Sequence, residues 1–186
     1  EIDPEIVRVG KRFFGMSQPN LEPIIADGRA FLAHTEQTYS VIGVDAYRLP
    51  YIPPHLTTVE FFQQAHDHLA DDGVLVINVG RTANDYRLVS AIASTLLSVF
   101  PSVHVFDVPN SFNAMVVATV QSTKATNLAK NLEALQGNTF LHTTAVRAVE
   151  NLRPTNPGNV VYTDDRASIE LMTNALLLDY VLGGLN

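Results

Sequence analysis

The stretch Thr38-Tyr-Ser-Val-Ile-Gly-Val-Asp-Ala-Tyr47 carries the most informative combination of residues in the chain. Its segment 39–44 is apolar and rich in β-branched residues, which is typical of a strand buried on both faces of a parallel sheet. The strand ends at Asp45, and a proline-rich loop, 49–55, follows. Ligands of open α/β sheets lie beyond the carboxyl ends of the strands, so a carboxylate there can reach a ligand. The alternative is that Asp45 only accepts backbone N–H bonds within its loop.

Around this stretch, helical and strand patterns alternate along the chain. The predicted strands are 22–26, 39–44, 74–79, 103–108 and 114–120, with a turn at 71–73 leading into the third. Helices are predicted at 4–14, 29–34, 59–69, 85–100, 126–135 and 169–182, from helical spacing and from capping residues such as Asp3, Asp27 and either Thr57 or Thr58. The short linker 109–113 predicts that the last two strands pair antiparallel. The pattern predicts one α/β domain over 1–186, with a mostly parallel sheet and an antiparallel C-terminal hairpin.

Composition excludes several classes of protein. The formal charge of -7 argues against a nucleic-acid-binding protein, which usually presents a basic face. The absence of cysteine removes disulfides, thiolate catalysis and cysteine metal sites, and it fits a reducing cytoplasm. The six histidines show no zinc-site spacing, so we predict no metal site. No apolar run approaches the roughly 18 residues that span a membrane, and the first residues lack a signal-peptide pattern. We therefore expect a cytoplasmic location.

Other polar and aromatic residues near the central strand are candidates for a binding site. Tyr47 and Tyr51 flank the proline-rich loop, where they either cover a ligand or pack the loop onto the sheet. His55 in the same loop either lines a pocket or is a solvated loop histidine. The cluster 163–166, Thr-Asp-Asp-Arg, either closes a pocket or contacts a subunit. Its alternative role is a helix cap with a local ion pair.

Several pieces of the sequence occur in an order that resembles a known family. They are Glu1-Ile-Asp-Pro, Asp27-Gly28, Tyr39-Ser-Val-Ile-Gly-Val-Asp45, Leu56-Thr-Thr-Val-Glu-Phe-Phe62, Leu69-Ala-Asp-Asp-Gly-Val-Leu-Val-Ile-Asn78 and Thr163-Asp-Asp-Arg-Ala-Ser-Ile-Glu170. Together they resemble the spermidine synthases, polyamine aminopropyltransferases on a Rossmann-like methyltransferase fold. The resemblance is to a branch often fused to membrane segments, which makes a membrane-fused region outside these residues one expectation. Members often form dimers, so a homo-oligomer is another.

The resemblance implies a role for each matching residue. Glu1 would hold the ribose hydroxyls of decarboxylated S-adenosylmethionine, because a carboxylate accepts two hydrogen bonds from a diol. Asp27 would accept from the adenine amino group, with Gly28 allowing close approach. Asp45 would be the general base that orients and deprotonates the amine of a polyamine or another small acceptor. From their position in the loop after Asp45, and not from the resemblance, Tyr47 and His55 are predicted to line the acceptor side. The alternatives are no role for Glu1 and helix capping for Asp27.

The sequence also departs from the family pattern. The first strand and the glycine-rich loop that the family has before the position of Glu1 are not represented. Arg48 stands where the family has a second acidic residue for the diamine, and a cation there would repel a protonated diamine. Asn113 stands where a substrate-facing tyrosine is expected. These departures keep two alternatives open, an S-adenosylmethionine-dependent methyltransferase and a non-catalytic nucleoside-binding or interaction remnant.

Overall fold

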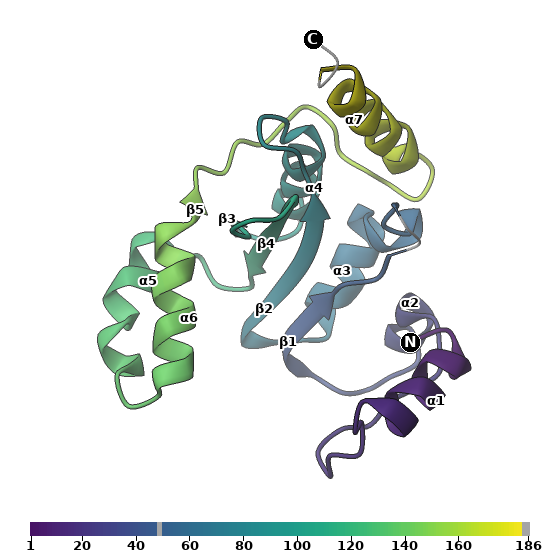
Figure 1. Ribbon diagram of the computed structural model, residues 1–186, viewed down its shortest axis with the longest axis vertical. Coiled ribbons are helices and arrows are strands. Elements are labelled where there is room, and N and C mark those ends of the chain that lie inside the picture. The colour runs from purple at the N-terminus through teal and green to yellow at the C-terminus, as the bar shows by residue number, and fades with distance from the viewer. Residues whose placement is uncertain (48–49, 184–186) are drawn as a thin grey trace. The chain divides into compact units, whose positions relative to one another are not determined.

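The computed structural model describes residues 1–47 and 50–183 (Figure 1). Arg48, which the sequence singles out as a departure from the family pattern, lies outside the described residues. The chain forms two compact units, Glu1–Gln37 and Thr38–Asn186, and each is described by itself. That residues 1–186 act as one domain stays a prediction.

The first unit contains two helices that begin at aspartates. Asp3 caps α1 (Pro4–Phe13), where its carboxylate accepts the backbone N–H of Glu5 at 2.8 Å. Gly15, just past the end of α1, has a φ of 62°, a left-handed conformation that favours glycine. Asp27 caps α2 (Gly28–Leu32). Both caps confirm the sequence prediction, because capping depends on local residues alone.

The predicted strand at 22–26 is wrong. These residues belong to no strand of the described sheet. Their backbone instead pairs with the first residue of the chain, since the N–H of Ala26 donates to the carbonyl oxygen of Glu1 at 3.1 Å. An apolar run forms a strand only where a neighbouring strand accepts its hydrogen bonds, and among the described residues this run pairs through its backbone with Glu1.

The second unit is built on a five-stranded sheet with the order β1-β2-β4-β3-β5. The strands are β1 (Tyr39–Val44), β2 (Leu69–Gly80), β3 (Ser102–Asp107), β4 (Asn113–Thr119) and β5 (Leu152–Arg153). Only β1 and β2 pair parallel, and the other three pairs are antiparallel. The prediction of a mostly parallel sheet is therefore wrong, while the predicted antiparallel β3–β4 hairpin is confirmed. The sheet is mostly antiparallel because β4 lies between β2 and β3 and opposes both.

The position of β1 at the edge of the sheet corrects a second expectation. Val44 is buried, but Val41 is 60% exposed, so β1 is not buried on both faces along its length. The register pairs Val44, the last residue of β1, with Ile77 of β2, so Asp45 follows at the level of Asn78 while β2 continues to Gly80. The predicted turn at 71–73 lies inside β2, near an irregularity in the β1–β2 register between Tyr39 and Val41.

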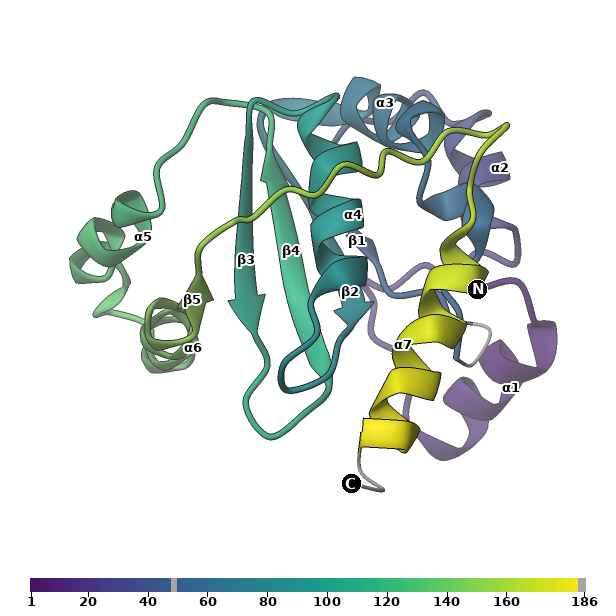
Figure 2. The same cartoon turned by 90° about the horizontal axis from the view of Figure 1, so that it is seen from above.

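Helices α3 and α4 supply the core against the sheet. Figure 2 shows α4 running along the sheet beside β4, and both helices carry fully buried side chains. The helices of this unit are α3 (Val59–Asp67), α4 (Arg87–Leu97), α5 (Thr126–Asn131), α6 (Thr139–Glu150) and α7 (Ile169–Gly183). Helices α5 and α6 pack mainly on each other, and α7 contacts α4. Within the described residues, no helix combines the length and the apolar character needed to cross a bilayer.

Candidate functional site

The adjacent carboxyl ends of β1 and β2 place Asp45 beside Asn78. The side-chain amide nitrogen of Asn78 donates to Asp45 Oδ1 at 3.0 Å. This bond fixes which way the amide faces, because a carboxylate accepts and only the NH₂ group of the amide can donate to it. Asp45 is exposed, so its carboxylate is accessible from solvent while one of its oxygens is held in place.

Sequence reasoning did not select Asn78 as a site residue, although it closes a quoted segment of the family pattern. Its Oδ1 atom is buried and finds no hydrogen-bond partner among the described residues. Such an acceptor usually has a partner in native proteins, so a donor supplied by a ligand is one way to satisfy it. Asn78 lies beside Asp45 because β1 and β2 pair in parallel. A correct prediction of that register would have identified Asn78 as a site residue.

Tyr47 anchors the start of the loop that follows Asp45. Its hydroxyl donates to the backbone carbonyl of Asn78 at 2.9 Å. Burial raises the pKa of Tyr47 to about 12, and the negative charge of Asp45 is the second cause of the increase. A hydrogen bond with the Gly80 backbone lowers this pKa by a smaller amount. Tyr47 therefore remains a neutral hydrogen-bond donor at physiological pH, and the structure brings it together with Asp45 and Asn78.

The remainder of the described loop runs from Pro50 to Thr58. His55 is the exposed middle residue of η1 (Pro54–Leu56), a short 3₁₀ turn. The Tyr51 hydroxyl donates to Asn174 Oδ1 of α7 at 2.7 Å, so it contacts the C-terminal helix.

In the first unit, the structure brings together the backbone positions predicted to bind the nucleoside. The Ala26–Glu1 hydrogen bond lies directly before Asp27, and a Glu1 carboxylate oxygen accepts the N–H of Asp3 at 3.0 Å. Asp27 Oδ1 accepts the N–H groups of Arg29 and Ala30, each at 3.0 Å. The capping role of Asp27 is thus confirmed. Gly28 opens α2, and a Cβ added there would meet no atom within 4 Å.

The strongest charge cluster lies farther along the same sheet edge, around Asp107 at the end of β3. Asp107 is buried, with Arg81 Nε 3.0 Å and Arg153 Nε 2.5 Å from its oxygens. The Tyr86 hydroxyl donates to the same carboxylate at 2.9 Å. This arrangement joins β2, β3, β5 and the start of α4, so its role is structural in the first instance.

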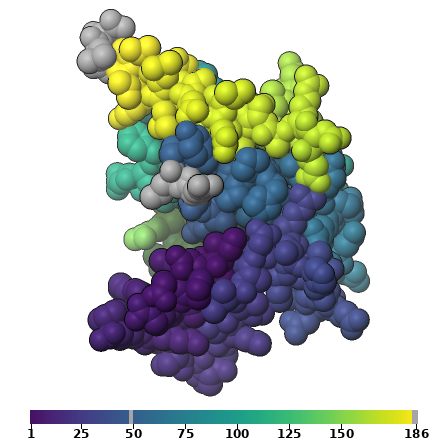
Figure 3. All heavy atoms as spheres, turned by 90° about the vertical axis from the view of Figure 1, so that its right-hand side faces the viewer, coloured from purple at the N-terminus to yellow at the C-terminus, as the bar shows by residue number. Residues whose placement is uncertain are grey.

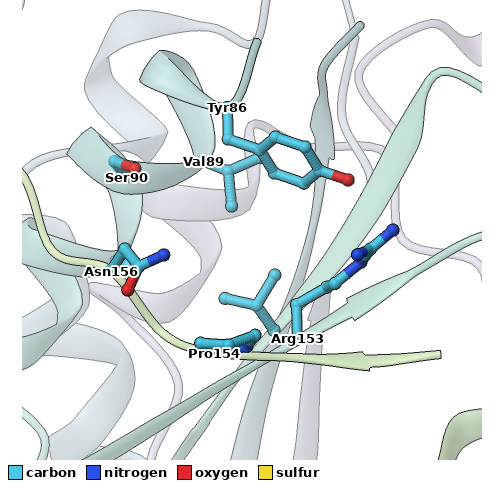
Figure 4. Close-up of a pocket in the computed structure, with 8 residues that line it drawn as sticks. Tyr86, Val89, Ser90, Arg153, Pro154 and Asn156 are labelled. Atoms are coloured by element: carbon cyan, nitrogen blue, oxygen red, sulfur yellow. The ribbon is translucent and has the colours of Figure 1, made fainter. Parts of the chain in front are cut away.

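Two cavities lie outside the Asp45 group. One, of about 220 Å³, is lined by Tyr86 and Val89 from the α4 side and by Arg153 and Pro154 from the opposite wall (Figure 4). The other, of about 740 Å³, lies between the segment 82–87 and α7. Neither is lined by Asp45. In residues 1–47 and 50–183, no group of three or more histidine, cysteine or carboxylate side chains is arranged to hold a metal.

Comparisons with known proteins supply the family. The model of the spermine/spermidine synthase domain matches residues 1–131. A "Probable polyamine aminopropyl transferase" of Bifidobacterium longum is 30% identical over 190 residues, 92% of this chain and 42% of that protein. A polyamine aminopropyltransferase of Vibrio vulnificus is 33% identical over 125 residues, 64% of this chain and 40% of that protein. The chain thus spans about two fifths of the length of these relatives.

Further comparisons support the fold and include a methyltransferase and a methyltransferase-like protein. The N-terminal histidine N-methyltransferase of Emericella nidulans is 32% identical over 135 residues, 66% of this chain and 24% of that protein. The structure of a probable spermidine synthase from Corynebacterium glutamicum has a TM-score of 0.59 at 24% identity, covering 80% of this chain and 60% of that one. The structure of human methyltransferase-like protein 13 has a TM-score of 0.60 at 23% identity, covering 92% of this chain and 75% of that one. The domain match over residues 1–131, with the fold and the strand-end carboxylate already described, shows that this chain belongs to the spermine/spermidine synthase family.

Proposed function

We propose that this chain is part of a transferase that moves an aminopropyl group from decarboxylated S-adenosylmethionine to a polyamine. The observation that carries the proposal is the exposed Asp45 carboxylate, held by Asn78 at the carboxyl end of β1 within the family-matched region. A carboxylate in that place can orient a nucleophile and accept its proton. The activity, the donor and the acceptor all belong to the proposal.

In the proposed reaction, the neutral amine nitrogen of the acceptor attacks the aminopropyl carbon bonded to the sulfonium sulfur. The new C–N bond forms as the C–S bond breaks, and the sulfur leaves as methylthioadenosine with the bond's electron pair. Asp45 accepts the proton that the amine loses. The Asn78 amide holds one Asp45 oxygen, so the carboxylate is oriented before the acceptor arrives.

The donor nucleoside is proposed to bind the carboxylates of the first unit. Glu1 would accept hydrogen bonds from the ribose hydroxyls and Asp27 from the adenine amino group, with Gly28 leaving room for the base. The Glu1–Ala26 backbone bond supports this assignment, because it holds the two positions in one compact unit. Asp27 has helix capping as an established role, so donor binding would be an additional one.

The acceptor is proposed to lie beside Asp45, Tyr47 and Asn78. The neutral Tyr47 hydroxyl and the unpartnered Asn78 oxygen give this surface polar character without a positive charge. That chemistry suits an amine better than an anion. His55 would contribute from the same loop.

A methyl transfer on the same fold is the second candidate. The observation that favours it is the match to a histidine N-methyltransferase over 66% of this chain, together with Arg48 in place of an acidic diamine contact. In that case S-adenosylmethionine, with its carboxyl group intact, would be the donor.

The test is a donor comparison on the full-length protein that contains this chain. It would be incubated with putrescine or spermidine and either donor, and the nucleoside product measured by chromatography. The proposal expects methylthioadenosine from decarboxylated S-adenosylmethionine. S-adenosylhomocysteine from the other donor would support the methyltransferase, while neither product would leave a non-catalytic binding role.

A further inference from the structure

The loop that follows Asp45 ends at residues held from the C-terminal part of the chain. Thr58 Oγ1 donates to Asp164 Oδ1 at 2.8 Å, and the N–H of Val59 donates to the carbonyl of Tyr162 at 2.9 Å. Thr58 and Asp164 are 106 positions apart, and Asp164 lies beyond the residues matched by the family model. The start of α3 is therefore fixed by a segment that lies outside the matched residues 1–131.

The hydrogen bonds at this contact use both the donor and an acceptor site of Thr58. Its hydroxyl accepts the N–H of Phe61 at 3.3 Å as the cap of α3, and it gives its single proton to Asp164. In return, the N–H of Asp164 donates to a Glu60 carboxylate oxygen at 3.0 Å. Glu60 thus completes a reciprocal arrangement with a distant segment.

A second hydrogen bond holds the loop to the C-terminal part of the chain at a residue closer to Asp45 in the sequence. The Tyr51 hydroxyl donates to Asn174 Oδ1 at 2.7 Å, and Ile52 between the two attachments is 2% exposed. Figure 3 shows the yellow atoms of the C-terminal helix lying against the blue atoms of this part of the chain. The loop is thereby tied to residues 162–174 at both ends of its described stretch 51–58.

We propose that Tyr162, Asp164 and Asn174 form a C-terminal clasp that sets the conformation of the loop residues 51–58 and so controls acceptor binding. Asp164 acts through Thr58 and does not touch the acceptor, so it is a positioning residue. The inference rests on the proposed function for its acceptor, but the clasp itself rests only on the hydrogen bonds above. Because the loop begins directly after Asp45 and carries Tyr47 and His55, loosening its far end would disturb the acceptor surface more than the donor carboxylates.

The test uses the full-length protein and a set of matched variants. Asp164→Ala and Thr58→Val break the contact, Thr58→Ser restores the hydroxyl, and Asp164→Asn keeps an oxygen that accepts from Thr58. Asn138→Ala is the control, because it removes the α6 cap, a bond from the N–H of Leu141 to Asn138 Oδ1 at 3.1 Å, with no contact to the loop. Hydrogen–deuterium exchange of residues 51–58 and the KM values for putrescine and for decarboxylated S-adenosylmethionine would be measured.

The clasp predicts about tenfold faster exchange of residues 51–58 in Asp164→Ala and Thr58→Val, with wild-type rates in Thr58→Ser and the control. It also predicts a rise of about tenfold in the KM for putrescine and a nearly unchanged KM for the donor. Unaltered exchange in the loop, or equal changes in both KM values, would overturn it. If even the wild-type protein shows no turnover, the proposed function fails. The exchange rates then still decide whether the clasp orders the loop.

Discussion

The side chain of Asn78 donates a hydrogen bond to the carboxylate of Asp45, a residue 33 positions earlier in the chain. The two side chains meet because β1 and β2 are parallel neighbours, and each residue directly follows the paired residues Val44 and Ile77. This pair is the centre of the proposed catalytic group, and Tyr47 is attached to the same asparagine through its backbone.

Replacing Asp45 by asparagine is expected to lower kcat by roughly 10²–10³-fold, because the proton acceptor is lost while the shape is kept. The measurement is methylthioadenosine release at saturating donor and acceptor. Asp71→Asn is the matched control, since Asp71 is an exposed carboxylate at the opposite end of β2. A kcat for Asp45→Asn equal to that of the control would show that Asp45 is not the base.

Replacing Asn78 by leucine is expected to lower kcat/KM by about tenfold, because Asp45 loses the bond that orients it. The double variant Asp45→Asn/Asn78→Leu should be no slower than Asp45→Asn alone, since Asn78 acts on the reaction through that carboxylate. Steady-state rates of the four proteins complete the cycle. Additive losses would mean that Asn78 acts independently of Asp45.

Asp27 offers a way to separate helix capping from donor binding. Asp27→Ser keeps a side-chain oxygen for the N–H groups at the start of α2, so the free energy of unfolding should change by less than about 0.5 kcal/mol. The KM for the donor should nevertheless rise by about tenfold, because the carboxylate that accepts from adenine is gone. Urea unfolding and donor titration would be measured together, with Asn138→Ser as the capping control. An unchanged donor KM would leave Asp27 as a cap alone.

The Asp107 cluster is expected to dominate the stability of the sheet edge. Asp107→Ala should lower the free energy of unfolding by about 3 kcal/mol, because it leaves the largely buried Arg81 guanidinium without its carboxylate. Arg153→Gln should cost much less, because the Arg153 side chain is 57% exposed and solvent screens its ion pair. Urea denaturation at pH 7 distinguishes the two. Similar losses in both variants would show that burial of Arg81 does not set the cost.

Alkaline pH should destabilise the fold through Tyr162. This residue is fully buried, and burial raises its pKa to about 12. Its unfolded pKa is about 10, so its contribution to stability is complete below pH 10 and is lost as pH rises toward 12. The free energy of unfolding should therefore fall across this window, and the fall should be smaller in Tyr162→Phe. Chemical denaturation at pH 9, 10 and 11 provides the measurement, and identical slopes in both proteins would contradict the prediction.

The sequence by itself determined the elements that depend on neighbouring residues. The strand 39–44, the aspartate caps of α1 and α2, the threonine cap of α3 and the 103–120 hairpin were all predictable, because each is encoded within a few positions. The ordered motifs ending at Asp45 and Asn78 also indicated the family, which the domain match over residues 1–131 confirms.

Only the tertiary structure decided which strands pair and which side chains meet. The mixed sheet, the edge position of β1 and the loss of the strand at 22–26 depend on partners distant in the sequence. So do the Asn78–Asp45 and Thr58–Asp164 hydrogen bonds, which join residues 33 and 106 positions apart. Local propensity acts over one or two turns of chain, whereas these contacts form only when buried polar groups find partners in the packed fold.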